Sequence, residues 1–128
     1  MGLDINFYRQ NKSDHDDYDE VGYFRKVNFL LTYFDVHEND NCTDIPITKD
    51  QIESLAQDTN AELIHKNLDV DNKEPLNESL RTKKVFFGGS IDYDDYYWQD
   101  IECVRDWAND ILKSFEWDKY NLVMCAWW

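Results

Sequence analysis

Four aspartates between positions 92 and 100 have the spacing best suited to acid-base or metal chemistry in this chain. They are Asp92, Asp94, Asp95 and Asp100. Clustered carboxylates hold divalent cations, or act as acid and base when their surroundings separate their pKa values, and we expect the cations Arg25 and Lys26 beside them. No His or Glu completes a metal-binding pattern here, and carboxylates also cap the free N–H groups of a helix start. We therefore favour capping, and expect no metal, no cofactor and no catalytic residue.

A second group of side chains is suited to binding a planar ligand. It comprises Tyr23, Arg25, Tyr93, Tyr97 and Trp98. Aromatic rings and a guanidinium can enclose a nucleotide-like molecule, and the glycine turn at 88–90 would let it approach the backbone. Rings of this kind more often form core and rim. A ligand-binding protein or enzyme using this group is therefore the alternative function.

The cysteines and histidines give no pattern for nucleophilic catalysis. We expect Cys103 and Cys125 to be buried and inert, because they fall on or beside apolar stripes, and Cys42 to lie in a loop. The three histidines, expected to be exposed, are His15, His37 and His65. Three cysteines without a C-x-x-C pair favour a reducing compartment, so we expect a cytoplasmic protein.

The charge of the chain restricts the partners that it can bind. Lys and Arg number 13 and Asp and Glu number 27, which gives a formal net charge of -14. Such a field repels nucleic acids and anionic membranes, so we expect the protein to bind neither. It favours binding to a basic protein surface. The need for solubility alone would also explain the negative charge. The acidic residues expected to bind a partner are Asp14, Asp16, Asp17 and Asp19 in one group and Asp92, Asp94 and Asp95 in another.

The second half of the chain predicts a strand, a turn and a long helix. Residues 85–87 are β-branched and aromatic, the glycines that follow end the strand, and the aspartates begin the helix. Apolar residues then recur at helical spacing up to position 115, on one face of that helix. They are Tyr97, Ile101, Val104, Ala108, Ile111, Leu112 and Phe115.

The remaining elements complete a three-stranded sheet. Apolar and polar residues alternate over 3–9, which predicts a strand. The polar residues 10–19 predict a surface loop. Residues 20–36 predict a helix that is apolar around most of its circumference. That helix is either central or covered by a second subunit, and we lean towards a homodimer surface. Thr48 and Gln51 have the spacing of a capping box before a helix over 49–66. Residues 120–128, apolar on both faces, predict an interior strand.

These elements predict one α+β, or small α/β, domain over residues 1–128. Their order is β-α-α-β-α-β, with a three-stranded mixed sheet packed by three helices. We expect strands two and three to be joined by a parallel crossover.

Several segments together resemble a family of short bacteriophage and prophage proteins that begin Met-Gly-Leu-Asp-Met-Tyr-Leu. The segments are 1–8 (Met-Gly-Leu-Asp-Ile-Asn-Phe-Tyr), 20–28 (Glu-Val-Gly-Tyr-Phe-Arg-Lys-Val-Asn), 86–88 (Phe-Phe-Gly) and 93–94 (Tyr-Asp), with a terminal Trp. The family has no assigned activity, so the resemblance implies a bacterial host and no catalytic residues. With the charge, it leads us to expect a non-enzymatic interaction protein that docks on a basic host protein. The sharpest version of that expectation is inhibition of a defence or regulatory factor of the host, one that itself binds nucleic acid.

Overall fold

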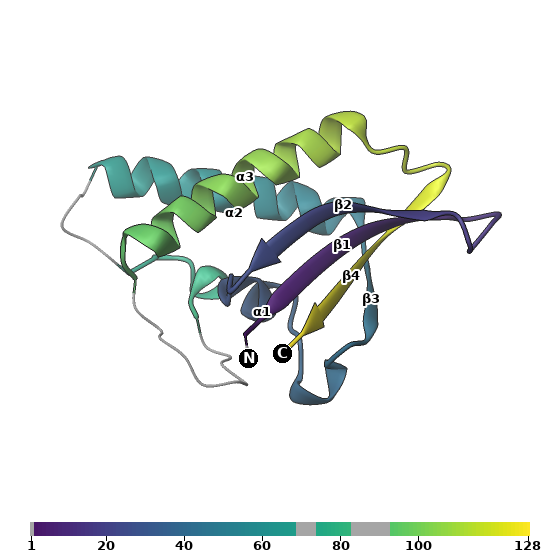
Figure 1. Ribbon diagram of the computed structural model, residues 1–128. Helices are drawn as coiled ribbons and strands as arrows, with labels where there is room; N and C mark the ends of the chain where they lie inside the picture. Colours follow the sequence, from purple (N-terminus) through teal and green to yellow (C-terminus); the bar gives the residue numbers. More distant parts are fainter. Residues whose placement is uncertain (1, 69–73, 83–92) are drawn as a thin grey trace.

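The fold is built on a four-stranded antiparallel sheet. The computed structural model describes residues 2–68, 74–82 and 93–128. Its strands are β1 (Asp4–Asn11), β2 (Tyr18–Arg25), β3 (Asp44–Ile47) and β4 (Tyr120–Trp127), arranged in the order β2-β1-β4-β3 (Figure 1). β1 and β4 are therefore interior strands, and all three pairings are antiparallel.

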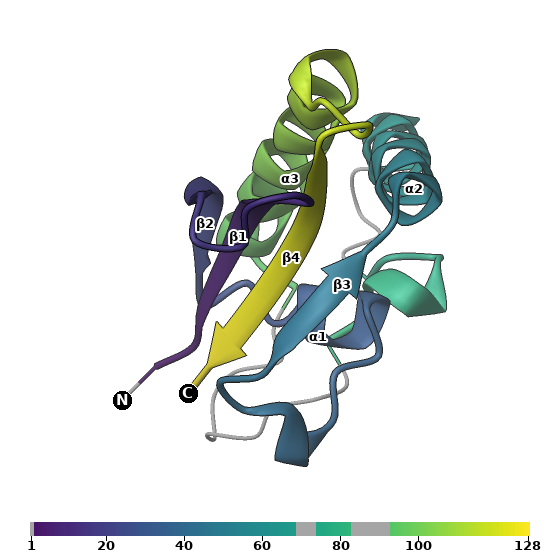
Figure 2. The ribbon, with the colours of Figure 1, turned by 90° about the vertical axis from the view of Figure 1, so that its right-hand side faces the viewer.

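The helices cover one face of this sheet. α2 (Lys49–Leu68) and α3 (Asp95–Ser114) lie side by side across it, and the short α1 (Phe29–Tyr33) packs beneath them (Figures 1 and 2). Two 3₁₀ turns, η1 (Glu38–Asp40) and η2 (Glu78–Leu80), lie in the connections. No helix of the described residues lies on the opposite face of the sheet (Figure 2).

The core fills the space between the sheet and the helices. Alternate residues of β1 and β4 are buried there, as the period of a strand requires. α3 buries residues at three- and four-residue steps against them. The buried side chains of these three elements are Ile5, Phe7, Leu122, Met124, Ala126, Tyr97, Ile101, Val104, Ala108 and Ile111.

Two of the three predicted helix starts are confirmed. The Thr48 N–H donates to Gln51 Oε1 at 2.8 Å, and the Gln51 N–H donates to Thr48 Oγ1 at 3.2 Å, which is the reciprocal pairing of a capping box. Asp94 caps α3, because its carboxylate accepts the Tyr97 N–H at 3.0 Å. The interior position of the last strand is confirmed as well.

The predicted three-stranded order is wrong, chiefly because residues 20–36 do not form one helix. Residues 18–25 instead form β2, which pairs with β1 in a hairpin. The turn of this hairpin is closed by a hydrogen bond that the Asn11 N–H donates to the Asp17 carbonyl at 2.8 Å. Gly22 is a poor residue for a helix interior, and Lys26 at φ 61° ends the strand before α1. β3, in the polar stretch after residue 37, was not predicted. The strand expected at 85–87 and the turn at 88–90 lie outside the described residues.

Three further expectations are decided by the fold. Residues 20–36 do not form one helix, so the homodimer surface expected on that helix is absent from the described structure. Cys103 is exposed rather than buried, and Cys125 is partly buried. All three histidines are exposed, as predicted. In the part of the chain that the structure describes, no helix is long and apolar enough to cross a lipid bilayer.

Candidate functional site: a cleft between strand β2 and helix α3

Trp107 of α3 fixes the distance between this helix and the edge strand β2. Its indole Nε1–H donates to the Val21 carbonyl at 2.9 Å, and its ring lies 4.3 Å from Phe7 and 5.4 Å from Phe24, centroid to centroid. A Cβ on Gly22 would lie 2.5 Å from the indole nitrogen, so only glycine leaves room for the ring. The contact therefore depends on both residues.

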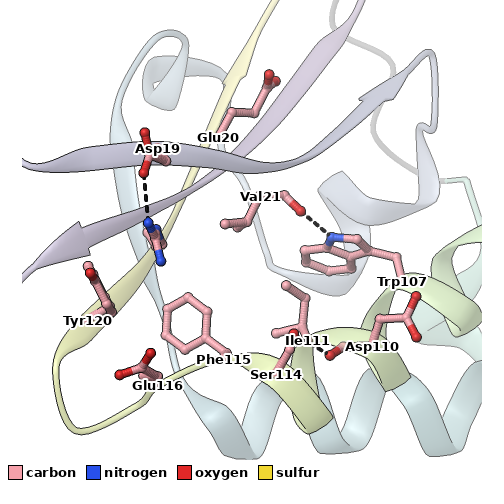
Figure 3. Close-up of a pocket in the computed structure, with 11 residues that line it drawn as sticks. Asp19, Glu20, Val21, Trp107, Asp110, Ile111, Ser114, Phe115, Glu116 and Tyr120 are labelled. Atoms are coloured by element: carbon pink, nitrogen blue, oxygen red, sulfur yellow. Dashed lines mark hydrogen bonds and ion pairs between the residues drawn. The ribbon is translucent and has the colours of Figure 1, made fainter.

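Beyond Trp107 the helix and the strand diverge and leave a cleft of about 560 Å³ (Figure 3). Val21, Trp107, Ile111 and Phe115 supply its apolar surface, and Tyr120 lies at its end (Figure 3). Its charged and polar lining consists of Arg9, Asp19, Glu20, Asp110, Ser114 and Glu116. Six of the eleven lining residues are therefore charged or polar, and the volume lies within the range of ligand-binding pockets.

The cleft is acidic, with Arg9 as its single cation. The Arg9 guanidinium pairs with Asp19 at 2.8 Å and lies 4.5 Å from the centre of the Tyr120 ring. The hydrogen bond to Asp19 raises the pKa of Arg9 above its ordinary value. Glu116 pairs with Lys119 at 3.1 Å, outside the lining. The four acidic residues outnumber Arg9, so the cleft favours cations.

Glu20 differs from the other acidic residues of the lining in the direction of its side chain. Its carboxylate points away from the cleft (Figure 3) and accepts a hydrogen bond from Asn6 Nδ2 at 2.6 Å. Asp19, Asp110 and Glu116 therefore supply the carboxylates nearest to a ligand in the cleft.

The side chains of the lining that could act on a ligand are carboxylates, one guanidinium, one serine hydroxyl and one tyrosine. It contains no His and no Cys. The Ser114 hydroxyl donates to the Asp110 carbonyl at 2.8 Å, a bond within the helix. Among the described residues no group of three or more His, Cys, Asp or Glu side chains is arranged to hold a metal ion.

The two groups of aspartates expected to bind a partner lie at opposite ends of the molecule. Asp14, Asp16, Asp17 and Asp19 belong to the β1–β2 hairpin, near the C-terminal end of α3, whereas Asp94 and Asp95 stand at its N-terminal end (Figure 1). A helix of 20 residues is about 30 Å long, so the groups do not form one surface. Asp92 lies outside the described residues. Of the hairpin aspartates, Asp19 lines the cleft together with Asp110 and Glu116.

The first carboxylate cluster is brought together in part. Asp94, Asp100 and Lys26 line a small hollow of about 130 Å³ beside Asn28. Asp95 is exposed in the first turn of α3. Burial, helped by the nearby charge of Asp94, raises the pKa of Asp100 from 3.8 to about 6.

The raised pKa of Asp100 predicts a pH-dependent loss of stability. Between pH 3.8 and about 6 the unfolded chain releases this proton while the folded chain keeps it, so stability falls as the pH rises through that window. Asp100→Asn should remove this contribution and raise the free energy of unfolding at pH 7 by about 1 kcal/mol, discounted because the group is only partly buried. Near pH 3.5 the two proteins should be equally stable. Urea unfolding across this range measures the difference.

A matched control for Asp100→Asn is Glu102→Gln, which neutralises an exposed carboxylate on the same helix. We expect no comparable change of pH dependence in it. An Asp100→Asn variant with the pH profile of the natural sequence would contradict the assignment.

The expected planar-ligand group is divided between two sides of the sheet. Tyr97 packs edge to face on Tyr93 at 4.9 Å and on Trp98 at 5.1 Å, and its buried hydroxyl donates to the Leu80 carbonyl at 2.6 Å. Tyr23 lies on the face away from the helices, where its hydroxyl donates to Asp4. Arg25 follows Tyr23 on the same strand. The structure therefore joins Tyr93, Tyr97 and Trp98 and leaves Tyr23 and Arg25 apart from them.

Trp107, Arg9 and Tyr120, which shape the cleft, were not singled out from the sequence. For Trp107 a signal was present, because it stands three residues after Val104 and four before Ile111 on the predicted helical stripe. Arg9 and Tyr120 gave none, since their contact depends on the pairing of β1 with β4.

Comparison of the chain with protein-family models, with curated proteins and with solved structures finds no match in any of the three.

Proposed function

We propose that this protein is a non-enzymatic interaction protein whose acidic cleft receives a basic side chain from a partner protein. The observation that carries the proposal is the cleft itself. Its carboxylates come from β2, from the end of α3 and from the residues just after it, and they border apolar side chains on which the stem of an arginine or lysine can pack. Such a side chain would bury its methylene groups against Phe115 and Ile111 and place its charge beside Asp110 and Glu116.

The overall charge supports the same proposal. With a formal net charge of -14, the field of the whole molecule speeds encounter with a basic surface and suppresses approach by nucleic acid. The hairpin aspartates Asp14, Asp16 and Asp17 extend the negative surface beyond Asp19. In this proposal the partner is a basic host protein, a setting supplied by the likeness to phage and prophage proteins.

Titration with a short arginine peptide at low ionic strength tests the cleft. We expect the indole Nε1–H resonance of Trp107 to shift in a saturable way, because this ring lines the cleft. Combining Asp110→Asn with Glu116→Gln should weaken binding roughly three- to tenfold, since exposed charge pairs each contribute up to about 1 kcal/mol. Raising the salt from low to physiological concentration should weaken binding of the natural sequence more than that of the variant.

Asp106→Asn is the matched control for these substitutions. Asp106 is an exposed carboxylate of the same helix that pairs with Arg105 at 3.0 Å and does not line the cleft. We expect it to bind the peptide as the natural sequence does. Equal losses in the control and in the cleft variant would show that only the overall charge matters, and would overturn the proposal.

A further inference from the structure

The face of the sheet away from the helices has the character of a second binding surface. No described helix or loop packs across it (Figure 2). We call this face of the sheet the open face. It carries the side chains of β1, β2 and β4 that alternate with the core residues. These are Asn6, Tyr8, Tyr18, Tyr23, Val123, Cys125 and Trp127.

Large aromatic side chains of the open face remain in contact with solvent. Tyr18 is 57% exposed, Tyr23 is 50% exposed and Trp127 is 45% exposed. Tyr8 stands edge to face against Tyr18 at 5.5 Å. A group of exposed rings on a regular sheet is typical of an interaction surface, because rings in solvent contribute nothing to the core.

Hydrogen bonds across the strands hold two of these rings, those of Trp127 and Tyr23, in fixed orientations. Trp127 Nε1–H donates to Asn6 Oδ1 at 3.1 Å, and Asn6 Nδ2 donates in turn to Glu20 Oε1 at 2.6 Å. The Tyr23 hydroxyl donates to Asp4, which raises the pKa of Tyr23 above its ordinary value. The network spans β4, β1 and β2, so a ligand would meet rings that are already ordered, which lowers the entropic cost of binding.

Next to these rings the open face is hollowed. Tyr8, Tyr18, Val123 and Cys125 line a depression of about 320 Å³, with Gln10 and Asp44 among its polar groups. The depression lies on the opposite side of the sheet from the cleft beside α3, so a ligand there would not compete for the same atoms.

The charges around the rings identify the kind of partner. Asp4, Glu20 and Asp44 lie on or beside the open face, as does the cation Arg25, which stands opposite Asp4 in the strand pairing. A planar guanidinium stacks on aromatic rings and also bonds carboxylates in a bidentate way, which an ammonium cannot do. A second copy of this chain, with the same charge of -14, would be repelled, as would a phosphate backbone.

We propose that the open face binds an arginine-rich segment of a partner protein, with guanidinium groups stacked on Tyr18 and Tyr23 and paired with the neighbouring carboxylates. This surface is separate from the cleft, and its assignment does not require the cleft to bind anything.

Two indole groups allow the surfaces to be observed separately. In a titration of the full chain with an arginine-rich peptide, we expect the Nε1–H resonance of Trp127 to shift as the open face fills. Combining Tyr18→Ser with Tyr23→Ser should weaken this binding about fivefold or more, since an exposed cation–π contact contributes about 0.5–1 kcal/mol. A lysine peptide of equal length and charge should bind this face more weakly than the arginine peptide.

Two control variants separate this proposal from the proposed function. Tyr96→Ser removes another exposed tyrosine, 75% exposed near the start of α3, and should leave the Trp127 response unchanged. Asp110→Asn, in the cleft, should also leave it unchanged. The open-face variant, conversely, should keep the Trp107 response.

Other results would overturn the proposal. They are a Trp127 resonance that does not respond to the arginine peptide, equal affinity for the lysine peptide, or equal losses in the Tyr96→Ser control. Concentration-dependent self-association that is lost in the open-face variant would identify a second copy as the occupant instead. A saturable Trp127 shift with a single-stranded oligonucleotide, and none with the peptide, would identify nucleic acid.

Discussion

Replacing Trp107 with alanine should lower the free energy of unfolding by about 3 kcal/mol. This value is at the lower end of the range for deleting a large core ring, because the Trp107 ring is only partly buried. The substitution removes the ring contacts with Phe7 and Phe24 and the hydrogen bond to the Val21 carbonyl. Urea unfolding at pH 7 measures the loss. A decrease below about 1 kcal/mol would contradict the role of Trp107 as the contact that fixes α3 against β2.

The substitution Gly22→Ala tests the contact between Trp107 and β2 from the side of the strand. The added methyl group would lie 2.5 Å from the Trp107 indole nitrogen, so the ring must move, at a cost of about 2 kcal/mol. In the Trp107→Ala background the methyl group meets no indole, and most of that cost should disappear, a coupling that a double-mutant cycle measures. Gly2→Ala is the matched control, because a Cβ there lies 3.5 Å from Lys26 Cε, an ordinary contact. An equal cost in both backgrounds would show that the strain lies elsewhere.

Replacing Glu62 with alanine should cost about 3 kcal/mol. Glu62 is only 6% exposed, and its carboxylate accepts the Asn77 N–H at 2.6 Å and the Leu76 N–H at 3.1 Å. These bonds attach the segment before η2 to α2, and their loss leaves two partly buried N–H donors without this acceptor. We expect lower thermal and urea stability, together with faster hydrogen exchange at residues 76 and 77.

Two variants test the origin of the Glu62 effect. Glu62→Gln keeps the size of the side chain and one acceptor oxygen, so it should cost clearly less than Glu62→Ala. Glu53→Ala shortens a less buried glutamate on the same helix and should change stability by well under 1 kcal/mol. Equal losses in the glutamine and alanine variants would indicate that charge, rather than the pair of acceptor oxygens, decides the effect.

The local signals in the sequence predicted the long helices and the interior strand correctly. Thr48 with Gln51 and Asp94 with the Tyr97 N–H form caps from residues within three positions of each other. The alternation in β1 and the two apolar faces of β4 likewise depend on immediate neighbours. Such features follow from short-range geometry, so they can be recognised without knowing the fold.

The failure at residues 20–36 has the opposite cause. Its apolar residues fit a helix at three- and four-residue steps, yet seven residues of β2 pair with β1, and this pairing allows Phe24 to pack on Phe7. The spacing of apolar residues along the chain does not reveal the free energy gained by pairing with a distant strand. The same limit applies to the cleft, because Arg9 meets Asp19 through the hairpin and Tyr120 through β4.

By itself the sequence determined a strongly acidic chain rich in aromatic residues, two long helices and their first residues, and it led us to expect cationic partners. Only the tertiary structure decided which acidic residues lie together and which aromatic rings face solvent. The reason is physical: charge and helix caps depend on composition and nearest neighbours, whereas a binding surface depends on strand order. Here that order places Asp19 opposite Asp110 across a cleft, and leaves Tyr18, Tyr23 and Trp127 on a face that no described element covers.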